Sequence, residues 1–259
     1  MIIAAIGGGA VEPAPGSSWR LITQPHHAFF AAELLALWRT DGLPDRPHRE
    51  DLLFATREHD NGWRELDASP TVDRERRVPR DFLAVPAALR REVWTRGTER
   101  YVEERPRAAL LIVQHALHLF RESAASAEWA DFVAQLRSVR DELLAQTGAS
   151  ESGVLEDYVW LDLADRISLV ACGALPRLDE PDGRTVTRAA EDPATGRVRL
   201  AIHPFPLAGA TTFKIPCRTV PGRLYAGDAD FAVEAASATW EELTVTVQEF
   251  DLKHLLTAT

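Results

Sequence analysis

Hydrophobic and polar residues follow two different periods along the chain, and the period changes near Pro176. Between Pro25 and about Leu175, apolar residues recur every three or four positions, which is the pattern of helices with one buried face. Proline and glycine interrupt this pattern where helices should end, as at Pro106 and Gly148. The predicted helices span residues 26–38, 48–60, 87–105, 107–123, 128–148 and 154–173.

Both ends of the chain favour strands. MIIAAI (1–6) and WRLIT (19–23) are separated by a loop rich in glycine and proline. In the C-terminal third, apolar and polar residues alternate around the turn-forming DPATG (192–196), which predicts a hairpin. We expect strands from both ends to share one small sheet. Further elements are predicted at 211–220 (strand), 228–240 (short helix) and 243–250 (strand).

These elements predict a mainly α protein, in which a helical bundle carries a small antiparallel β extension. The C-terminal strands form this extension, and the N-terminal strands are candidates to join it. Glycines 7–9 do not predict a dinucleotide site, because Pro13 and Pro15 stand where a phosphate-binding helix would begin. The predicted segments are an N-terminal β hairpin (1–24), a helical core (25–175) and a C-terminal β-rich extension (176–259).

The composition is typical of a soluble globular protein, with 46% hydrophobic and 26% charged residues. No segment approaches the roughly 18–20 consecutive apolar residues that span a bilayer, and MIIAAI is too short for a signal peptide and lacks a basic flank. The net charge of −10, without a basic stripe, argues against nucleic-acid binding. We therefore expect a cytoplasmic protein with neither a membrane nor a nucleic-acid partner. Whether it forms a homo-oligomer is left open.

Lysine and cysteine usage exclude several kinds of site. Lys214 and Lys253 are the only lysines, so the chain has no Walker-type lysine and no catalytic lysine before residue 214. Cys172 and Cys217 are the only cysteines, which excludes a disulfide scaffold and a four-thiolate zinc site. We expect both thiols to be reduced.

Residues suited to metal binding gather in the helical region. Apart from His48 at the start of one helix, five of the eight histidines fall in three predicted helices: His26 and His27, then His59, then His115 and His118. Asp60 directly follows His59, and Asp165 lies in the last predicted helix. Imidazole and carboxylate groups suit zinc, iron, manganese and related ions. Because a helical bundle can aim such side chains at one point, the sequence predicts a metal site.

The order His, His-Asp, further His and a final Asp resembles the HD-domain superfamily, whose members are mostly helical and metal-dependent. The resemblance implies ligation by His27, His59, Asp60 and Asp165. Additional histidines between the pair and the last Asp are typical of dinuclear members, which adds His115 and then His118. The implied cofactor is one or two divalent ions of manganese, iron, cobalt or zinc.

Many HD-domain proteins are phosphohydrolases, and the resemblance implies hydrolysis of a small phosphorylated substrate, nucleotides included, by metal-activated water. Asp60 would bridge or anchor the metal. Many members carry Gly-Lys shortly after the pair, whereas Trp63 follows Gly62 here. Binding of an anionic substrate therefore falls to Arg57, Arg64 or Arg166. The alternatives are an HD-type di-iron oxygenase acting on a small molecule and a non-enzymatic metal-binding module.

The whole chain also resembles an uncharacterised bacterial family of unknown function, which implies no particular activity. The resemblance depends on ITQPHHAFFAAEL, EHDNGW, the apolar stretch around His115, ADRISL and IHPFPL. The agreement of QPHHA with a QPxHA pattern favours His27 over His26 as the ligand.

Each candidate ligand also has a structural interpretation. Asn61-Gly62 could simply end a helix, with Gly62 left-handed and Asp60 in an Asx turn. Negative charge is unfavourable at a helix C-terminus, however, and a cation is favourable there, so a metal accounts for Asp60 better. His115 could be a hydrogen-bonded core residue, and Asp165 could pair with Arg166. Asp162, one turn earlier, is the substitute if Asp165 points away.

Overall fold

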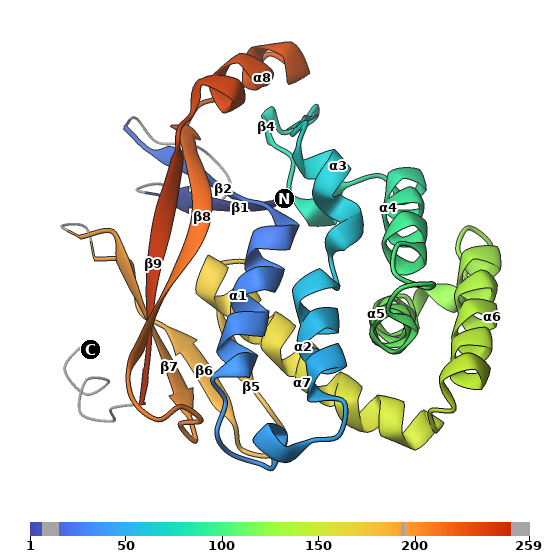
Figure 1. Cartoon of the computed structure of the whole chain (residues 1–259). Helices are drawn as coiled ribbons and strands as arrows, with labels where there is room; N and C mark the ends of the chain where they lie inside the picture. The colour runs from blue at the N-terminus through green and yellow to red at the C-terminus, as the bar shows by residue number, and fades with distance from the viewer. Residues whose placement is uncertain (7–15, 193–194, 250–259) are drawn as a thin grey trace.

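The predicted helices are present in the structure. A computed structural model describes residues 1–6, 16–192 and 195–249 (Figure 1). The predicted loop over 7–15, Pro193 and Ala194 of the DPATG turn, and residues 250–259 lie outside the described residues. The long helices are α1 (Gln24–Ala36), α2 (Arg49–Glu58), α4 (Ala87–Glu99), α5 (Pro106–Leu119), α6 (Ala130–Thr147) and α7 (Glu151–Cys172).

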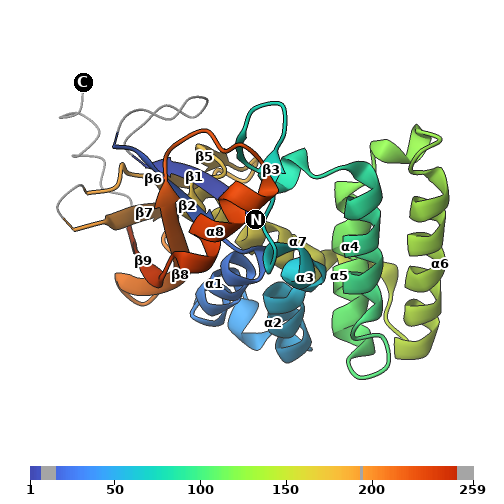
Figure 2. The same ribbon diagram turned by 90° about the horizontal axis from the view of Figure 1, so that it is seen from above.

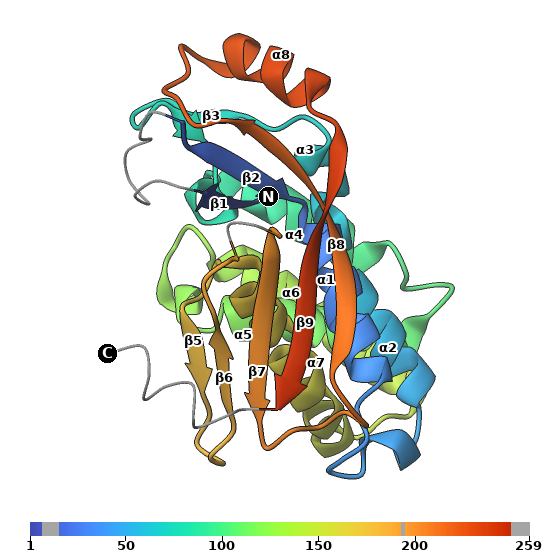
Figure 3. The same cartoon turned by 90° about the vertical axis from the view of Figure 1, so that its left-hand side faces the viewer.

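A seven-stranded mixed sheet combines strands from both ends of the chain, in the order β1-β2-β8-β9-β7-β6-β5. The sheet is curled, so that β1 and β2 lie across the direction of the C-terminal strands (Figure 3). Its strands are β1 (Ile2–Ile6), β2 (Ser18–Ile22), β5 (Arg177–Asp179), β6 (Thr185–Arg188), β7 (Arg197–His203), β8 (Thr211–Pro221) and β9 (Trp240–Glu249).

The predicted fold class is therefore wrong. The protein is an α/β protein with a large mixed sheet, rather than a mainly α bundle with a small antiparallel extension. The expectation that strands from both ends share one sheet is confirmed, because β2 pairs with β8. The sheet is mixed because β9, reached after helix α8 (Asp228–Ser237), lies between β8 and β7 and runs parallel to β7. Such non-local pairings leave no trace in local periodicity.

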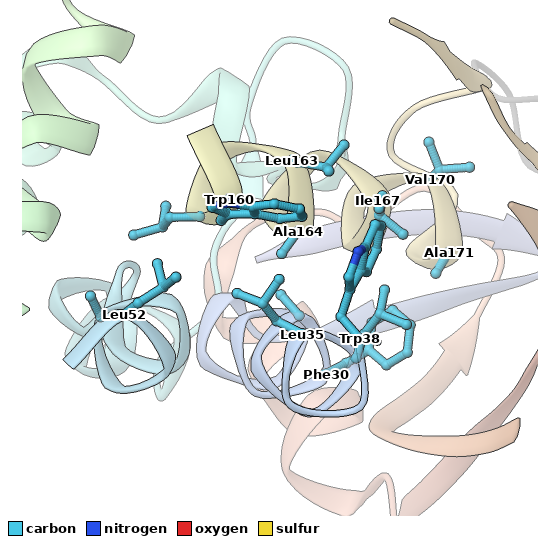
Figure 4. Packing of buried hydrophobic residues seen from close by; sticks show 14 of the residues in the cluster. Phe30, Leu35, Trp38, Leu52, Trp160, Leu163, Ala164, Ile167, Val170 and Ala171 are labelled. Carbon is cyan, nitrogen blue, oxygen red and sulfur yellow. The ribbon is translucent and has the colours of Figure 1, made fainter. Parts of the chain in front are cut away.

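Helices α1 and α7 pack against the sheet and form the main hydrophobic core with it. Alternate residues of β7, namely Val198, Leu200 and Ile202, are fully buried, as expected for a strand with one face covered. Around Trp38 and Trp160, side chains of α1, α2 and α7 interdigitate (Figure 4). The sheet thereby fixes α1 and α7, which carry two of the candidate ligands.

The remaining helices extend away from the sheet. Helix α2 packs on α1, α5 packs on α2 and α7, and α4 and α6 flank α5 (Figures 1 and 2). Helix α8 contacts β8 beside a smaller core of Trp19, Leu21, Tyr225 and Phe231. The short elements are η1 (Leu43–Asp45), η2 (Asn61–Trp63), α3 (Arg64–Asp67), β3 (Val72–Asp73), β4 (Val78–Pro79), η3 (Phe82–Ala84) and η4 (Ser123–Ala125).

Across the described residues, none of the helices combines the length and the apolar character needed to span a membrane. The described cysteines, Cys172 and Cys217, are both free thiols in buried positions, as expected from the sequence.

Candidate metal centre

Five buried side chains from four helices converge on one point. His27 lies in the first part of α1, His59 and Asp60 directly follow α2, His115 lies in α5, and Asp165 lies in α7. His27 Nε2 is 2.8 Å from Asp60 Oδ2, while His59 Nε2 is 3.5 Å from Asp60 Oδ2 and 3.3 Å from Asp165 Oδ1. Ligand atoms of His27, His59 and Asp60 lie within 4.8 Å of one another, and so do those of His59, His115 and Asp165.

The start of α1 decides which of two adjacent histidines turns inward. Thr23 caps the helix by accepting a hydrogen bond from the backbone N–H of His26, and Pro25 occupies the first turn. His27 is 1% exposed and faces the cluster. His26 packs edge-on against Trp240 of β9, with ring centroids 5.0 Å apart. Neighbouring positions on a helix face about 100° apart, so only one of the pair can reach the cluster.

The His-Asp pair sits where α2 tightens into η2. Asn61 ties this bend to helix α4, because its Nδ2 donates to the carbonyl oxygens of Glu58 at 2.7 Å and Gly97 at 2.9 Å. Gly62 does not have the left-handed conformation predicted for it. It is needed for close approach instead, because a Cβ there would lie 2.0 Å from the Val93 carbonyl oxygen. The Asn-Gly dipeptide therefore holds the pair against α4.

Hydrogen bonds at the far ring nitrogens fix the protons of two histidines. His59 Nδ1 lies 2.7 Å from the carbonyl oxygen of Thr56, which can only accept. The Ser168 hydroxyl donates to the Asp165 carbonyl oxygen at 2.6 Å, so its Oγ accepts from His27 Nδ1 at 2.7 Å. In their neutral forms both rings therefore carry the lone pair on Nε2, the atom that faces the carboxylates.

His115 is held in the same way by a tyrosine. Tyr158 donates its hydroxyl proton to Asp162 Oδ1 at 3.2 Å and so accepts from His115 Nδ1 at 3.3 Å. The ring of His115 lies 5.0 Å from that of His59, measured between centroids. Hydrogen bonds at Nδ1 that orient a histidine are typical of metal ligands. His115 is therefore the third ring whose Nε2 is left available.

The cluster requires positive charge that no arginine or lysine among the described residues supplies. Asp60 and Asp165 pair only with histidines among the described residues, and neither contacts an arginine or lysine there. Burial disfavours a charged His59, but Asp60 and Asp165 outweigh it and raise its pKa to about 9. Burial also opposes ionisation of both carboxyl groups, yet the nearby histidines hold their pKa values below the usual range. Burial and the neighbouring His59 lower the pKa of His115 to about 4.

These groups fit a divalent cation. His59 Nε2 is buried and makes no hydrogen bond of acceptable geometry within the described residues, although two carboxylate oxygens lie within 3.5 Å of it. Lone pairs of neutral imidazoles and carboxylate oxygens repel one another unless a cation lies among them. Imidazole nitrogens and carboxylate oxygens are also the donors preferred by zinc, iron, manganese and cobalt. The described His and Asp groups could therefore hold a metal ion.

A cavity of about 220 Å³ adjoins the cluster. His27, Asp60, His115 and Asp165 all contribute to its wall, so the cavity gives a small molecule access to the candidate ligands. Most of the remaining wall is apolar and comes from Trp63, Phe82, Leu83, Trp94, Leu119, Phe120 and Leu169. Gln24 and Arg90 add polar groups.

Two further residues named from the sequence lie beside the cluster rather than in it. His118 is 38% exposed at its side chain and its Nε2 lies 3.8 Å from Asp162 Oδ1. Asp162 itself accepts from Tyr158 and from Arg166 Nε at 2.9 Å. The structure thus brings Asp165 rather than its substitute Asp162 to the candidate ligands, and it turns His118 away from them.

The arginines nominated for anion binding are occupied elsewhere. Arg57 lies over the Phe29 ring, with its Cζ 5.2 Å from the centroid. Arg64 forms an ion pair with Glu58, and Arg166 binds Asp162 and Glu180. None of the three lines the cavity beside the candidate ligands.

The sequence pattern did not single out the residues that orient the ligands, nor those that line the rest of the cavity. Ser168 and Tyr158 support His27 and His115 from α7, and Arg90 is the arginine that reaches the cavity. Ser168 follows Asp165 by three positions, a helical spacing that places both on one face. Arg90 precedes Trp94 by four positions and shares its face in the same way, but nothing local shows that this face meets His115.

The chain belongs to the family described as "Protein of unknown function (DUF3891)", whose model matches residues 13–222. This finding agrees with the resemblance to an uncharacterised family. No curated protein and no solved structure shows significant similarity to the chain.

Proposed function

We propose that this protein is a metal-dependent hydrolase of the HD type, acting on a small molecule. In this proposal His27, His59, Asp60 and Asp165 hold one divalent cation of manganese, iron, cobalt or zinc. One observation carries the proposal. The buried Nε2 atom of His59 lacks a hydrogen-bond partner in the described part of the chain, yet lies 3.3 and 3.5 Å from two carboxylate oxygens beside a cavity.

A divalent cation at these ligands supplies Lewis acidity, which lowers the pKa of a water molecule and polarises the bond to be hydrolysed. The chain's own residues supply orientation. Thr56 and Ser168 keep the Nδ1 protons of His59 and His27 away from the site. The aromatic walls, including Trp63 and Trp94, limit the water that reaches the cavity.

His115 is the group placed to move a proton. Its lowered pKa of about 4 keeps the ring neutral near pH 7. Its Nδ1 proton is held by Tyr158, so Nε2 is the nitrogen that can accept a proton from water or substrate. Tyr158 in turn donates to Asp162, and these two hydrogen bonds fix the orientation of the His115 ring.

A single ion is favoured over two because the structure offers few ligands for a second. His118, the second of the two additional histidines expected in a dinuclear site, faces Asp162 and is 38% exposed at its side chain. A di-iron oxygenase is the second candidate, and one observation favours it. His59, His115 and Asp165 form a second group of close ligand atoms that shares His59 with the first.

Metal analysis of protein purified without added metal tests the proposal. We expect about one equivalent of a divalent metal in the wild type and none in Asp60→Asn, because this change removes an anionic ligand between two histidines. His26→Gln is the matched control, since His26 adjoins His27 but packs against Trp240; it should keep its metal. Unchanged metal content in Asp60→Asn would contradict the site.

Activity measurements separate the two candidate reactions. Hydrolysis of p-nitrophenyl phosphate or p-nitrophenyl acetate that requires the bound metal, and that is lost in Asp60→Asn, would support the hydrolase. Two irons per chain with oxygen consumption would favour the oxygenase instead. A stoichiometric metal without either activity, and with thermal stability that depends on it, would support a structural binding module.

A further inference from the structure

Arg90 carries a positive charge in the cavity wall, and the described residues provide no anionic partner for it. It lies in the first turn of α4 and lines the cavity together with the candidate ligands. Its guanidinium group rests over Trp129, with Cζ 5.2 Å from the ring centroid. Within the described residues we find no ion pair to Arg90, and its Nε is buried without a hydrogen-bond partner.

The charges on the two sides of the cavity differ. Asp60 and Asp165 together balance the charge of one divalent cation, so the proposed centre is close to neutral once the cation is bound. Arg90 then leaves one uncompensated positive charge. A single guanidinium group among the mostly apolar side chains on this side of the cavity matches one carboxylate, with which it can form paired hydrogen bonds. A dianionic phosphate or a polyphosphate would leave excess negative charge in the cavity.

The position of Arg90 sets the polarity of the bound molecule. Arg90 and Trp94 are one helical turn apart on α4, or about 6 Å along its axis. Trp94 contacts His115, with ring centroids 5.7 Å apart. Arg90 is therefore displaced by one turn of α4 from the side chain that contacts His115. The cavity volume of about 220 Å³ is below the roughly 300–1,000 Å³ of drug-sized ligand sites, which favours a molecule smaller than a nucleoside triphosphate.

Two further residues of the cavity wall carry buried polar atoms. Trp63 is 3% exposed and Gln24 is 1% exposed. Trp63 Nε1, a donor, and Gln24 Oε1, an acceptor, have no hydrogen-bond partner in the part of the chain that the structure describes. Buried polar atoms without partners are costly, and a ligand that supplies both an acceptor and a donor would satisfy them. This wall is thus suited to a polar ligand with an apolar body.

We infer that the cavity binds a small monocarboxylate with an aromatic or branched apolar body. Its carboxylate is bound by Arg90, its body lies against Trp63 and Trp94, and its reacting bond lies near His115 and Asp60. The placement of the reacting bond and the match to a single negative charge rest on the proposed function, whereas the position of the anion site at Arg90 does not. The phosphorylated, nucleotide-like substrate expected from the sequence is replaced in this inference by a smaller and less charged molecule.

Binding of 3-phenylpropionate tests the inference, measured by calorimetry on metal-loaded and on chelated protein. We expect 3-phenylpropionate to bind both forms of the protein. The neutral analogue 3-phenylpropanamide and the dianion phenyl phosphate should each bind with an affinity at least about tenfold lower. Arg90→Gln should lower the affinity for 3-phenylpropionate by about tenfold or more, because it removes a charge-assisted hydrogen bond. Amide binding by Arg90→Gln should be unchanged, which shows that the cavity is intact.

Arg91→Gln is the matched control. Arg91 also lies over Trp129, at 5.4 Å, but pairs with Glu128 and does not line this cavity. It should leave all affinities unchanged. The inference is overturned if Arg90→Gln binds 3-phenylpropionate as the wild type does, if phenyl phosphate binds more tightly than the carboxylate, or if no carboxylate binding is detected. Absence of metal from the wild type would overturn the proposed hydrolase alone, because the chelated protein still reports on Arg90.

Discussion

Two clusters of buried carboxylates in this protein are neutralised in different ways. Asp157 in α7 is 4% exposed and accepts from Arg46 Nε and Nη2 at 2.9 and 2.8 Å, with Arg107 Nη2 at 3.4 Å. Asp60 and Asp165 are 6% and 7% exposed but have only histidines for partners among the described residues. The first cluster contains its own cations. The second depends on protons or a metal.

Asp157 and Asp165 lie in the same helix, α7, but differ in role: Asp157 is held in ion pairs with arginines, whereas Asp165 faces groups that can bind a proton or a metal. A guanidinium group carries a permanent charge, so the cationic partners of Asp157 cannot lose their charge by giving up a proton. Imidazole can exchange its proton for a metal ion, so the cluster around Asp60 can change its occupant.

Asp157→Asn and Asp165→Asn should fail in opposite ways. Removing the charge of Asp157 leaves two arginines without their buried partner and should lower the free energy of unfolding by about 3 kcal/mol, with metal content unchanged. Asp165→Asn should abolish stoichiometric metal binding, so that added metal no longer raises the melting temperature. Chemical denaturation and metal analysis of both variants check this. The comparison fails if both variants lose metal, or if both keep it.

Ser168→Ala should weaken metal binding without abolishing it. The Ser168 hydroxyl receives the Nδ1 proton of His27 and thereby holds Nε2 toward Asp60. Loss of such an orienting group typically lowers metal affinity by about 10- to 100-fold. Competition with a chromogenic chelator measures the change. Ser138→Ala, on an exposed part of α6, is the control and should have wild-type affinity.

The pH dependence of stability should differ between the metal-free and metal-loaded forms. Asp60 and Asp165 raise the pKa of His59 to about 9, with the rings of His27 and His115 also facing it. A raised pKa contributes stability that is complete below the unfolded value of about 6.5 and is lost as pH rises through the folded value.

The melting temperature of the chelated protein should therefore fall as pH rises from about 6.5 to 9. The metal-loaded form should not show this loss, because metal binding displaces the proton and strengthens as pH rises. Thermal unfolding across this range, with and without chelator, makes the measurement. Parallel curves for the two forms would show that His59 does not exchange a proton for the metal.

His118→Ala should have the smallest effect. Its side chain is 38% exposed and faces Asp162, so we expect metal content and affinity to stay within about twofold of the wild type. His115→Ala on the same helix provides the comparison. His115 is buried at the cluster, so this substitution should reduce metal-dependent activity. A larger loss of metal in His118→Ala than in His115→Ala would show that His118 contributes more to metal binding than His115 does, and would support a dinuclear site.

The sequence alone determined the helices and the order of the candidate ligands along them. Periods of three and four residues are local, and they predicted α1, α2, α5, α6 and α7 with end errors of one to four residues. Helix α4 ends at Glu99, six residues before the predicted end. The adjacency of His59 and Asp60 at a helix end is likewise a local fact. The preference for His27 over His26 depended on a resemblance to a family, and the structure places His27 in the cluster.

Only the tertiary structure decided the fold class, the rotation of each helix and the character of the cavity. The seven-stranded sheet depends on pairings between residues as distant as Leu21 and Arg218, which no local pattern records. Whether His115 or His118 faces the cluster depends on how α5 packs against α2 and α7. Arg90 becomes part of the site only because α4 is held close at Gly62 and Gly97. Periodicity specifies which face of a helix is buried, whereas packing decides what that face meets.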